Sequence, residues 1–112
     1  MIYPTESENM MSSKNRESQI PQDIKEAIIR VLKAHGAARI SIFGSYARGE
    51  AGPESDIDIL VRFGRPRSLI QLVTIEDELR LALHRNVDLL TEKAVSPYLR
   101  DVVLRDEVVI LE

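Results

Sequence analysis

The chain of 112 residues predicts an α/β domain in which helices and short strands alternate and pack in layers. Two observations predict this class. Apolar residues recur at helical spacing in two long segments, and short Val-, Ile- and Leu-rich runs bounded by Gly or Pro stand between and after them. The length suits one domain with a modest core, which we place over residues 20–112. Residues 1–19 are polar and lack a period, so we expect a flexible tail there.

The first half of the domain begins with a helix between Pro21, which suits an opening turn, and Gly36, which suits a stop. Its residues that share one apolar stripe are Ile24, Ala27, Ile28, Val31 and Leu32. We then expect a strand over 38–43, a short helix over 45–49, a loop over 50–55 and a strand over 56–63.

The second half begins with a long helix over about 68–84. Most of its apolar face is expected to come from Leu69, Leu72, Val73, Leu79 and Leu83. A strand over 86–92, a short helix from Pro97 to about Arg105 and a strand over 107–111 complete the prediction. Of the strands 56–63 and 107–111, we expect one to be central and the other to lie at an edge covered by a partner or a symmetry mate.

The composition of the chain argues against several classes of function. A formal net charge of -3 argues against direct, sequence-independent binding of nucleic acid, which relies on basic surfaces. The absence of cysteine excludes disulfides, thiolate zinc sites and a cysteine nucleophile. No apolar run approaches the roughly 20 residues that span a bilayer, and the N-terminus lacks the apolar core of a signal peptide. We therefore expect a cytoplasmic protein with no membrane partner.

Two aspartates inside an apolar strand raise the main chemical question. Asp56 and Asp58 alternate with one isoleucine, so both side chains leave the same face, with Cα atoms roughly 6.6 Å apart. Buried carboxylates need water, an arginine or a metal ion beside them. Oxygen ligands at this spacing suit Mg²⁺. Asp88, in the apolar run "NVDLL", becomes a third ligand or a proton acceptor if its strand neighbours the first.

The segment before these acids suggests an anion site. Gly44 follows a strand and lets the backbone turn tightly against a ligand. The helix start after it offers free N–H groups, and Ser45 adds a hydroxyl donor. Arg48, one turn later, is within reach of a phosphate. Gly44, Ser45 and Arg48 are therefore candidate nucleotide-binding residues.

Each of these features also has an ordinary structural explanation. The Gly-Ser pair can be a helix cap, Asp88 can pair with Arg85, and Arg48 can be a solvated surface residue. The cluster of Arg62, Arg65 and Arg67 is read as a solvated loop, with contact to a partner or a nucleotide as the alternative. What favours a joint site is the occurrence of turn, hydroxyl, arginine and three strand acids in this order.

The string "FGSYARGEAGPESDIDILV", with Gly44-Ser45, ten intervening residues and Asp56-x-Asp58, resembles the minimal nucleotidyltransferases of the DNA polymerase β-like nucleotidyltransferase superfamily. The resemblance implies that superfamily's fold, a small mixed β-sheet flanked by helices. It implies that Gly44 and Ser45 contact the nucleotide phosphates, and Arg48 matches the family arginine. It further implies that the catalytic carboxylates Asp56, Asp58 and Asp88 hold two Mg²⁺ ions.

The family resemblance also implies a function. Many members are the antitoxin of a HEPN-domain toxin and are thought to transfer AMP from ATP to a tyrosine of that ribonuclease. We expect the same here, with ATP as substrate, the HEPN protein as partner and a homo- or hetero-oligomer as the assembly. The small domain leaves the acceptor site open, which suits a protein substrate. The alternatives are an antitoxin that only binds its toxin, and transfer to a small molecule or nucleic acid.

Overall fold

The computed structural model describes residues 20–112, and the tail predicted over residues 1–19 lies outside the described residues. The elements in chain order are α3 (Gln22–Ala34), β1 (Ala37–Phe43), α4 (Ser45–Arg48), β2 (Ile57–Phe63), α5 (Leu69–Leu83), β3 (Val87–Thr91), the 3-10 turn η1 (Glu92–Ala94), α6 (Pro97–Asp106) and β4 (Val108–Leu111). Every helix and strand expected from the sequence in this range is present, with ends that differ by at most one residue. Among the described residues, no helix has both the length and the apolar character needed to cross a membrane.

The four strands form one mixed sheet in the order β3-β2-β1-β4. Strands β2 and β3 are parallel, whereas β1 is antiparallel to both β2 and β4. The predicted α/β class is therefore confirmed. The expectation that one of the two apolar strands is central and the other lies at an edge is also confirmed, because β2 lies inside the sheet and β4 lies at an edge. The covering of that edge by a partner or a symmetry mate stays a prediction.

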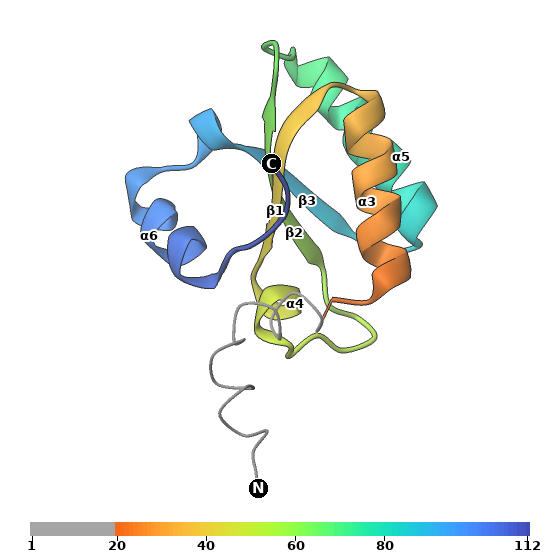
Figure 1. Cartoon of the computed structure of the whole chain (residues 1–112), viewed down its shortest axis with the longest axis vertical. Coiled ribbons are helices and arrows are strands. Elements are labelled where there is room, and N and C mark those ends of the chain that lie inside the picture. The colour runs from red at the N-terminus through yellow and green to blue at the C-terminus, as the bar shows by residue number, and fades with distance from the viewer. Residues whose placement is uncertain (1–19) are drawn as a thin grey trace, which may run out of the picture.

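The two faces of the sheet carry different residues because side chains alternate along a strand. On one face Ile57, Ile59 and Val61 pack in the main core beneath α3 and α5. On the other face Leu60 belongs to a smaller core with Val103 of α6. Figure 1 shows α3 and α5 on one side of the sheet and α6 on the other. Asp58, which lies between Ile57 and Ile59, is thus on the α6 side.

Helix α3 confirms the predicted apolar stripe. Ile24, Ala27, Ile28 and Leu32 are buried in the main core, and Val31 packs against it. The helix ends where Gly36 adopts a positive φ of 89°, a conformation that glycine reaches without the strain of a Cβ atom.

The predicted apolar face of α5 is wrong in part. Leu79 and Leu83 are buried and Leu72 is half-buried, but Leu69 is 77% exposed and Val73 is 48% exposed. The position that the spacing missed is Ile75, which is buried. Apolar residues occur around most of this helix, so their spacing alone does not define the side that meets the core.

Side chains of α5 hold the edge strand β3 in place. Glu76 Oε2 accepts a hydrogen bond from the backbone N–H of Leu89 at 3.0 Å, and Arg80 Nη2 donates to the carbonyl oxygen of Val87 at 3.3 Å. These contacts occupy backbone groups on the outer edge of β3, where another chain would otherwise pair. They also help to keep β3, which carries Asp88, aligned with β2.

The side of α5 that faces the core can be tested by two leucine substitutions. Replacing the fully buried Leu79 by alanine is expected to lower the free energy of unfolding by about 2–5 kcal/mol, because it leaves a cavity. Leu69→Ala, at a position predicted to be buried but found exposed, should change it by less than about 0.5 kcal/mol. Chemical denaturation of both variants measures the difference, and equal losses would contradict the observed orientation of the helix.

Candidate active site

Asp58 and Asp88 are brought together by the parallel pairing of β2 with β3. The two residues are Cα partners in the register, with Ile57 opposite Val87 before them and Ile59 opposite Leu89 after them. Parallel partners project their side chains from the same face of a sheet. The expectation that the strand of Asp88 neighbours the strand of Asp58 is therefore confirmed.

The closeness of these carboxyl groups changes the acidity of Asp58. Its pKa is raised from 3.8 to about 6, first because partial burial removes water from the charged form. The charge of Asp88 and a side-chain hydrogen bond with it raise the pKa further, and the charge of Asp56 adds to the effect. Arg48 acts in the opposite direction. Asp58 thus lies in a field that is predominantly negative.

Asp56 lies just before β2 and is exposed. It is close enough for its charge to act on Asp58. Within residues 20–112, however, no three or more His, Cys, Asp and Glu side chains are grouped so that they could hold a metal ion. What the structure brings together is the Asp58–Asp88 pair, with Asp56 beside it as a source of negative charge.

Gly44 lies directly against Asp58. It follows β1, whose last residue Phe43 pairs with Asp58, and its φ of 76° is in the region that favours glycine. A Cβ atom at this position would overlap the Oδ2 atom of Asp58. The turn predicted from the Gly-Ser pair therefore exists, and it needs glycine both for its backbone conformation and for its contact with the carboxylate.

Ser45 is the first residue of the one-turn helix α4, and it is half-buried. The first N–H groups of a helix have no partner inside that helix, so this turn presents backbone donors beside an acidic pair. The buried side chains of Tyr46 and Ala47 anchor the turn in the main core. Donors for an anion and ligands for a cation thus lie side by side.

Arg48 is not a free surface side chain, although the sequence allowed that interpretation. Its Nε atom donates to Glu50 at 2.9 Å, and its Nη1 atom donates to Asp106 of α6 at 2.8 Å. The pKa of Arg48 is raised by these hydrogen bonds. The arginine therefore connects the turn after β1 with the C-terminal end of α6.

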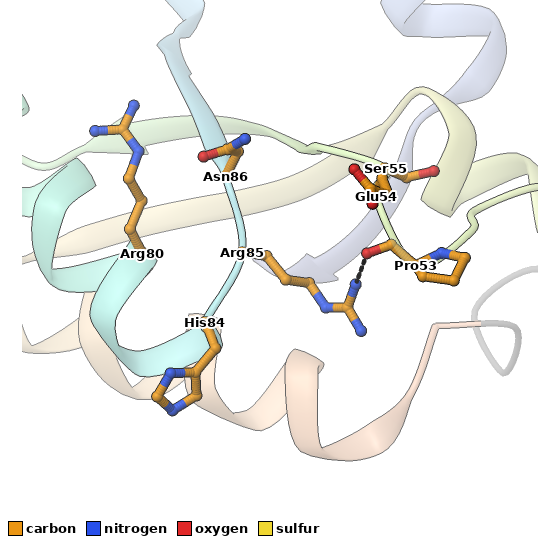
Figure 2. Close-up of a pocket in the computed structure, with 7 residues that line it drawn as sticks. All are labelled: Pro53, Glu54, Ser55, Arg80, His84, Arg85 and Asn86. Atoms are coloured by element: carbon orange, nitrogen blue, oxygen red, sulfur yellow. Dashed lines mark hydrogen bonds between the residues drawn. The ribbon is translucent and has the colours of Figure 1, made fainter.

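Arg85, which the sequence suggested only as a partner of Asp88, supports the loop before Asp56. Arg85 donates from Nη1 to the carbonyl oxygen of Pro53 at 3.2 Å, and its guanidinium lies 5.8 Å from the centre of the Tyr46 ring. Figure 2 shows the side chain of Arg85 reaching across to Pro53. Arg85 therefore fastens this loop to α4 from a position three residues before Asp88.

The cavity in Figure 2 lies between this loop and the end of α5. Its volume is about 410 Å³, and it is lined by Pro53, Glu54, Ser55, Arg80, His84, Arg85 and Asn86. The carbonyl oxygen of Asn86 accepts from the N–H of Ile57, and Ser55 Oγ accepts from the N–H of Gly52. The backbone on both sides of Asp56 is therefore held by hydrogen bonds.

The site can place an anionic group against the Gly44–Ser45 turn while the Asp58–Asp88 pair attracts a cation. A cation held between carboxylates can in turn neutralise a phosphate chain. The exposed Asp88 is available to accept a proton from a group that approaches from solvent. This arrangement suits chemistry on a phosphate ester or anhydride.

Comparison with known proteins agrees with chemistry on a phosphate group. A family model for the nucleotidyltransferase domain matches residues 24–110, a range that contains all the candidate site residues. A candidate protein adenylyltransferase of Methanocaldococcus jannaschii is 48% identical over 89 residues, which are 80% of this chain and 96% of that relative.

Solved structures share the fold. A toxin–antitoxin crystal structure with AMP-PNP matches with a TM-score of 0.71 and 28% identity, over 77% of this chain and 71% of the other. A second structure contains the tri-AMPylated HEPN toxin of Shewanella oneidensis in complex with its MNT antitoxin. It matches with a TM-score of 0.66 and 27% identity, over 78% of this chain and 68% of the other.

The close approach of Gly44 to Asp58 predicts the effect of adding one methyl group. Gly44→Ala should lower the free energy of unfolding by about 1–2 kcal/mol, because alanine is strained at positive φ, and the overlap with Asp58 should weaken nucleotide binding. Gly52→Ala, where an added Cβ meets nothing within 4 Å, is the matched control and should change neither quantity appreciably. Denaturation and calorimetric titration with AMP-PNP would measure both, and identical behaviour of the variants would contradict the assigned contact.

The raised pKa of Asp58 predicts a pH dependence of stability in protein free of divalent cations. The folded state holds the proton more tightly than the unfolded state, so this stabilisation is complete below about pH 3.8 and is lost as the pH rises through about 6. Asp88→Asn should lower the pKa of Asp58, which carbon-detected NMR can follow, and Asp58→Asn should remove this part of the pH dependence. An unchanged Asp58 titration in Asp88→Asn would show that the pair does not interact.

Proposed function

The chain belongs to the nucleotidyltransferase domain family, and on this premise we propose that it transfers AMP from ATP to a hydroxyl group of a partner protein. The observation that carries the proposal is the contact of the Gly44 turn with Asp58, which in turn is paired with Asp88. One short segment thereby offers backbone donors for phosphates beside carboxylates for a cation.

We propose that Gly44 and Ser45 contact the nucleotide phosphates and that Asp58 and Asp88 hold the metal, with Asp56 as a third ligand that would have to move closer to the pair. The donor set fits Mg²⁺, because all its side-chain ligands are hard oxygens and the repulsion within the pair is relieved by a divalent cation. When bound, Mg²⁺ would neutralise the triphosphate and the pyrophosphate leaving group. Arg48, already held beside the turn by Glu50 and Asp106, adds positive charge there.

The transfer itself is a substitution at the α-phosphorus of ATP. The oxygen of the acceptor hydroxyl forms the new bond to this phosphorus, the bond to the bridging oxygen of the β-phosphate breaks, and pyrophosphate leaves with the electron pair. Asp88, which is exposed, is the residue that we propose takes the proton of the hydroxyl. The remaining contribution of the protein is to position both reactants.

The proposed acceptor is a tyrosine of a HEPN-domain toxin, which makes this chain an antitoxin that acts in the cytoplasm, where ATP is supplied. Support comes from the structural neighbours, one of which is an MNT antitoxin with an AMPylated HEPN toxin and another a toxin–antitoxin structure with an ATP analogue. The exposure of Asp56 and Asp88 also fits an acceptor presented on the surface of another protein.

Intact-mass spectrometry tests the proposal directly. A HEPN-domain protein, sought first among the products of the neighbouring genes, is incubated with the chain, ATP and Mg²⁺, and its mass is expected to rise in AMP-sized steps. Asp56→Asn should slow the transfer by about 100-fold or more, because it removes a charged ligand. Asp23→Asn, an exposed aspartate in the first turn of α3, is the matched control and should transfer normally. A stable complex without any gain in mass would instead support an antitoxin that only binds its toxin.

A further inference from the structure

We propose that the end of the molecule opposite the Gly44 turn is a docking surface for an acidic segment of the acceptor protein. This inference rests on the proposed function and adds to it the place where the partner is held. The surface has two parts. The basic groove consists of Arg62, Arg65, Arg67 and Lys93, and the apolar margin consists of Leu69, Ile70 and Val73.

The docking surface and the transfer site lie at opposite ends of β2. The strand begins beside Asp56 and ends at Phe63, seven residues that span roughly 20 Å. Figure 1 shows α4 at one end of the sheet and the connection from β2 to α5 at the other. A partner bound at the far end therefore leaves the Gly44 turn and the acidic pair open to nucleotide.

The groove is a cavity of about 410 Å³ with an excess of positive charge. Besides the four basic residues it is lined by a single acid, Glu92. Arg62 approaches Glu92 only to 3.9 Å, and Glu92 is shared with Arg39, which lies closer at 3.3 Å. Within residues 20–112, Arg65 and Lys93 have no ion pair. The chain as a whole has a net charge of -3, so this concentration of cations is local.

Other arginines of the described chain show the contrast. Arg39, Arg48 and Arg80 each lie within ion-pair distance of at least two acidic side chains. Their charges are largely neutralised inside the domain. Like charges gathered without such partners repel each other and attract an anionic ligand. The groove is therefore complementary to acidic groups that this part of the chain does not supply.

Arg67 is held in a defined position within the groove. Its guanidinium stacks over the ring of Phe63 at 5.2 Å and donates from Nη2 to the carbonyl oxygen of His35. Its Nε atom is buried and has no hydrogen-bond partner among the described residues. A cation held in a fixed position is better prepared to bind a carboxylate than a freely moving side chain.

The apolar margin adjoins the groove at the start of α5, directly after Arg67 and Ser68. Leu69 and Ile70 are 77% and 79% exposed, and Val73 is 48% exposed. Three large apolar side chains within two turns of a helix are unusual on a surface that meets only water. An apolar patch beside charged groups is a common composition of protein–protein interfaces.

These features favour a protein over RNA as the occupant. Binding of single-stranded RNA relies on exposed aromatic rings that stack on the bases, but the one aromatic residue of the groove, Phe63, is already stacked with Arg67. The exposed Leu and Ile side chains offer nothing to a phosphate backbone. A peptide segment that carries both acidic and apolar side chains satisfies both parts of the surface.

The charge of the groove is tested with a matched pair of variants. Arg65→Glu and Arg30→Glu both reverse an exposed arginine that has no ion pair within residues 20–112, one in the groove and one on α3. Binding to the proposed HEPN-domain partner is measured by calorimetry, with Asp56→Asn as the parent and without ATP so that no transfer takes place. Arg65→Glu should weaken binding at least about tenfold, and Arg30→Glu by less than about twofold. Equal affinities would overturn the proposal.

The apolar margin is tested with a second matched pair of variants. Ile70→Ser should weaken the same complex about tenfold, whereas Leu81→Ser, at a 76%-exposed position near the other end of α5, should leave it unchanged. Both variants are expected to fold, because neither side chain is buried, and melting curves would check this. If the two weaken binding to the same extent, the patch is not part of an interface.

Two further measurements distinguish a failure of the docking surface from a failure of the proposed function. AMP-PNP binding should be unaffected by Arg65→Glu, because the groove lies away from the turn. A partner that binds in a groove-dependent manner but is never AMPylated would refute the proposed function and leave the docking surface standing. If Arg65→Glu instead abolishes binding of a single-stranded RNA oligonucleotide while partner binding persists, the groove is a nucleic-acid site and the proposal is wrong.

Discussion

The pairing of Asp58 with Asp88 is the constraint on which the rest of the site depends. Two carboxyl groups on neighbouring strands repel each other when both are charged, and the raised pKa of Asp58 reflects its partial burial first and this repulsion second. The register persists because apolar neighbours on the opposite face, Ile57 and Val87, are buried in the main core. A shift of β3 by one residue would move Val87 out of the core and Asp88 into it. The core therefore stabilises an arrangement that the acids alone would disfavour.

The same constraint explains how the surrounding contacts are distributed. Glu76 and Arg80 hold the outer edge of β3, while Arg85 fastens the loop that precedes β2. Each contact supports a strand or loop that carries one of the acids, and none of them uses the acids themselves. The carboxylates thus remain available for a cation. Structural support from groups outside the reacting centre is what allows a small domain to keep charged side chains in a strained pair.

The sequence indicated the order of elements and the composition of the site, because both depend on local pattern. The glycine before the α4 turn, the two acids at the start of β2 and the acid in β3 can each be recognised from the few residues around them. The role of Arg85 and the pairing of Arg48 with Asp106 were not predictable, since these contacts join residues 32 and 58 positions apart. The buried side of α5 was misjudged for a related reason. Its apolar residues face several directions, and the positions of α3 and of the sheet decide which of them are covered.

The apolar residues of α5 that the core does not cover suggest a role in binding another protein. When a helix has more apolar side chains than the core can bury, the exposed ones either promote aggregation or contact another protein. Leu69, Ile70 and Val73 lie beside the basic groove, whereas Leu81 stands alone near the other end of the helix. A domain this small has little surface near its reacting groups with which to choose an acceptor. Recognition at the far end of β2 would separate the choice of partner from the chemistry, so that each can change in sequence without disturbing the other.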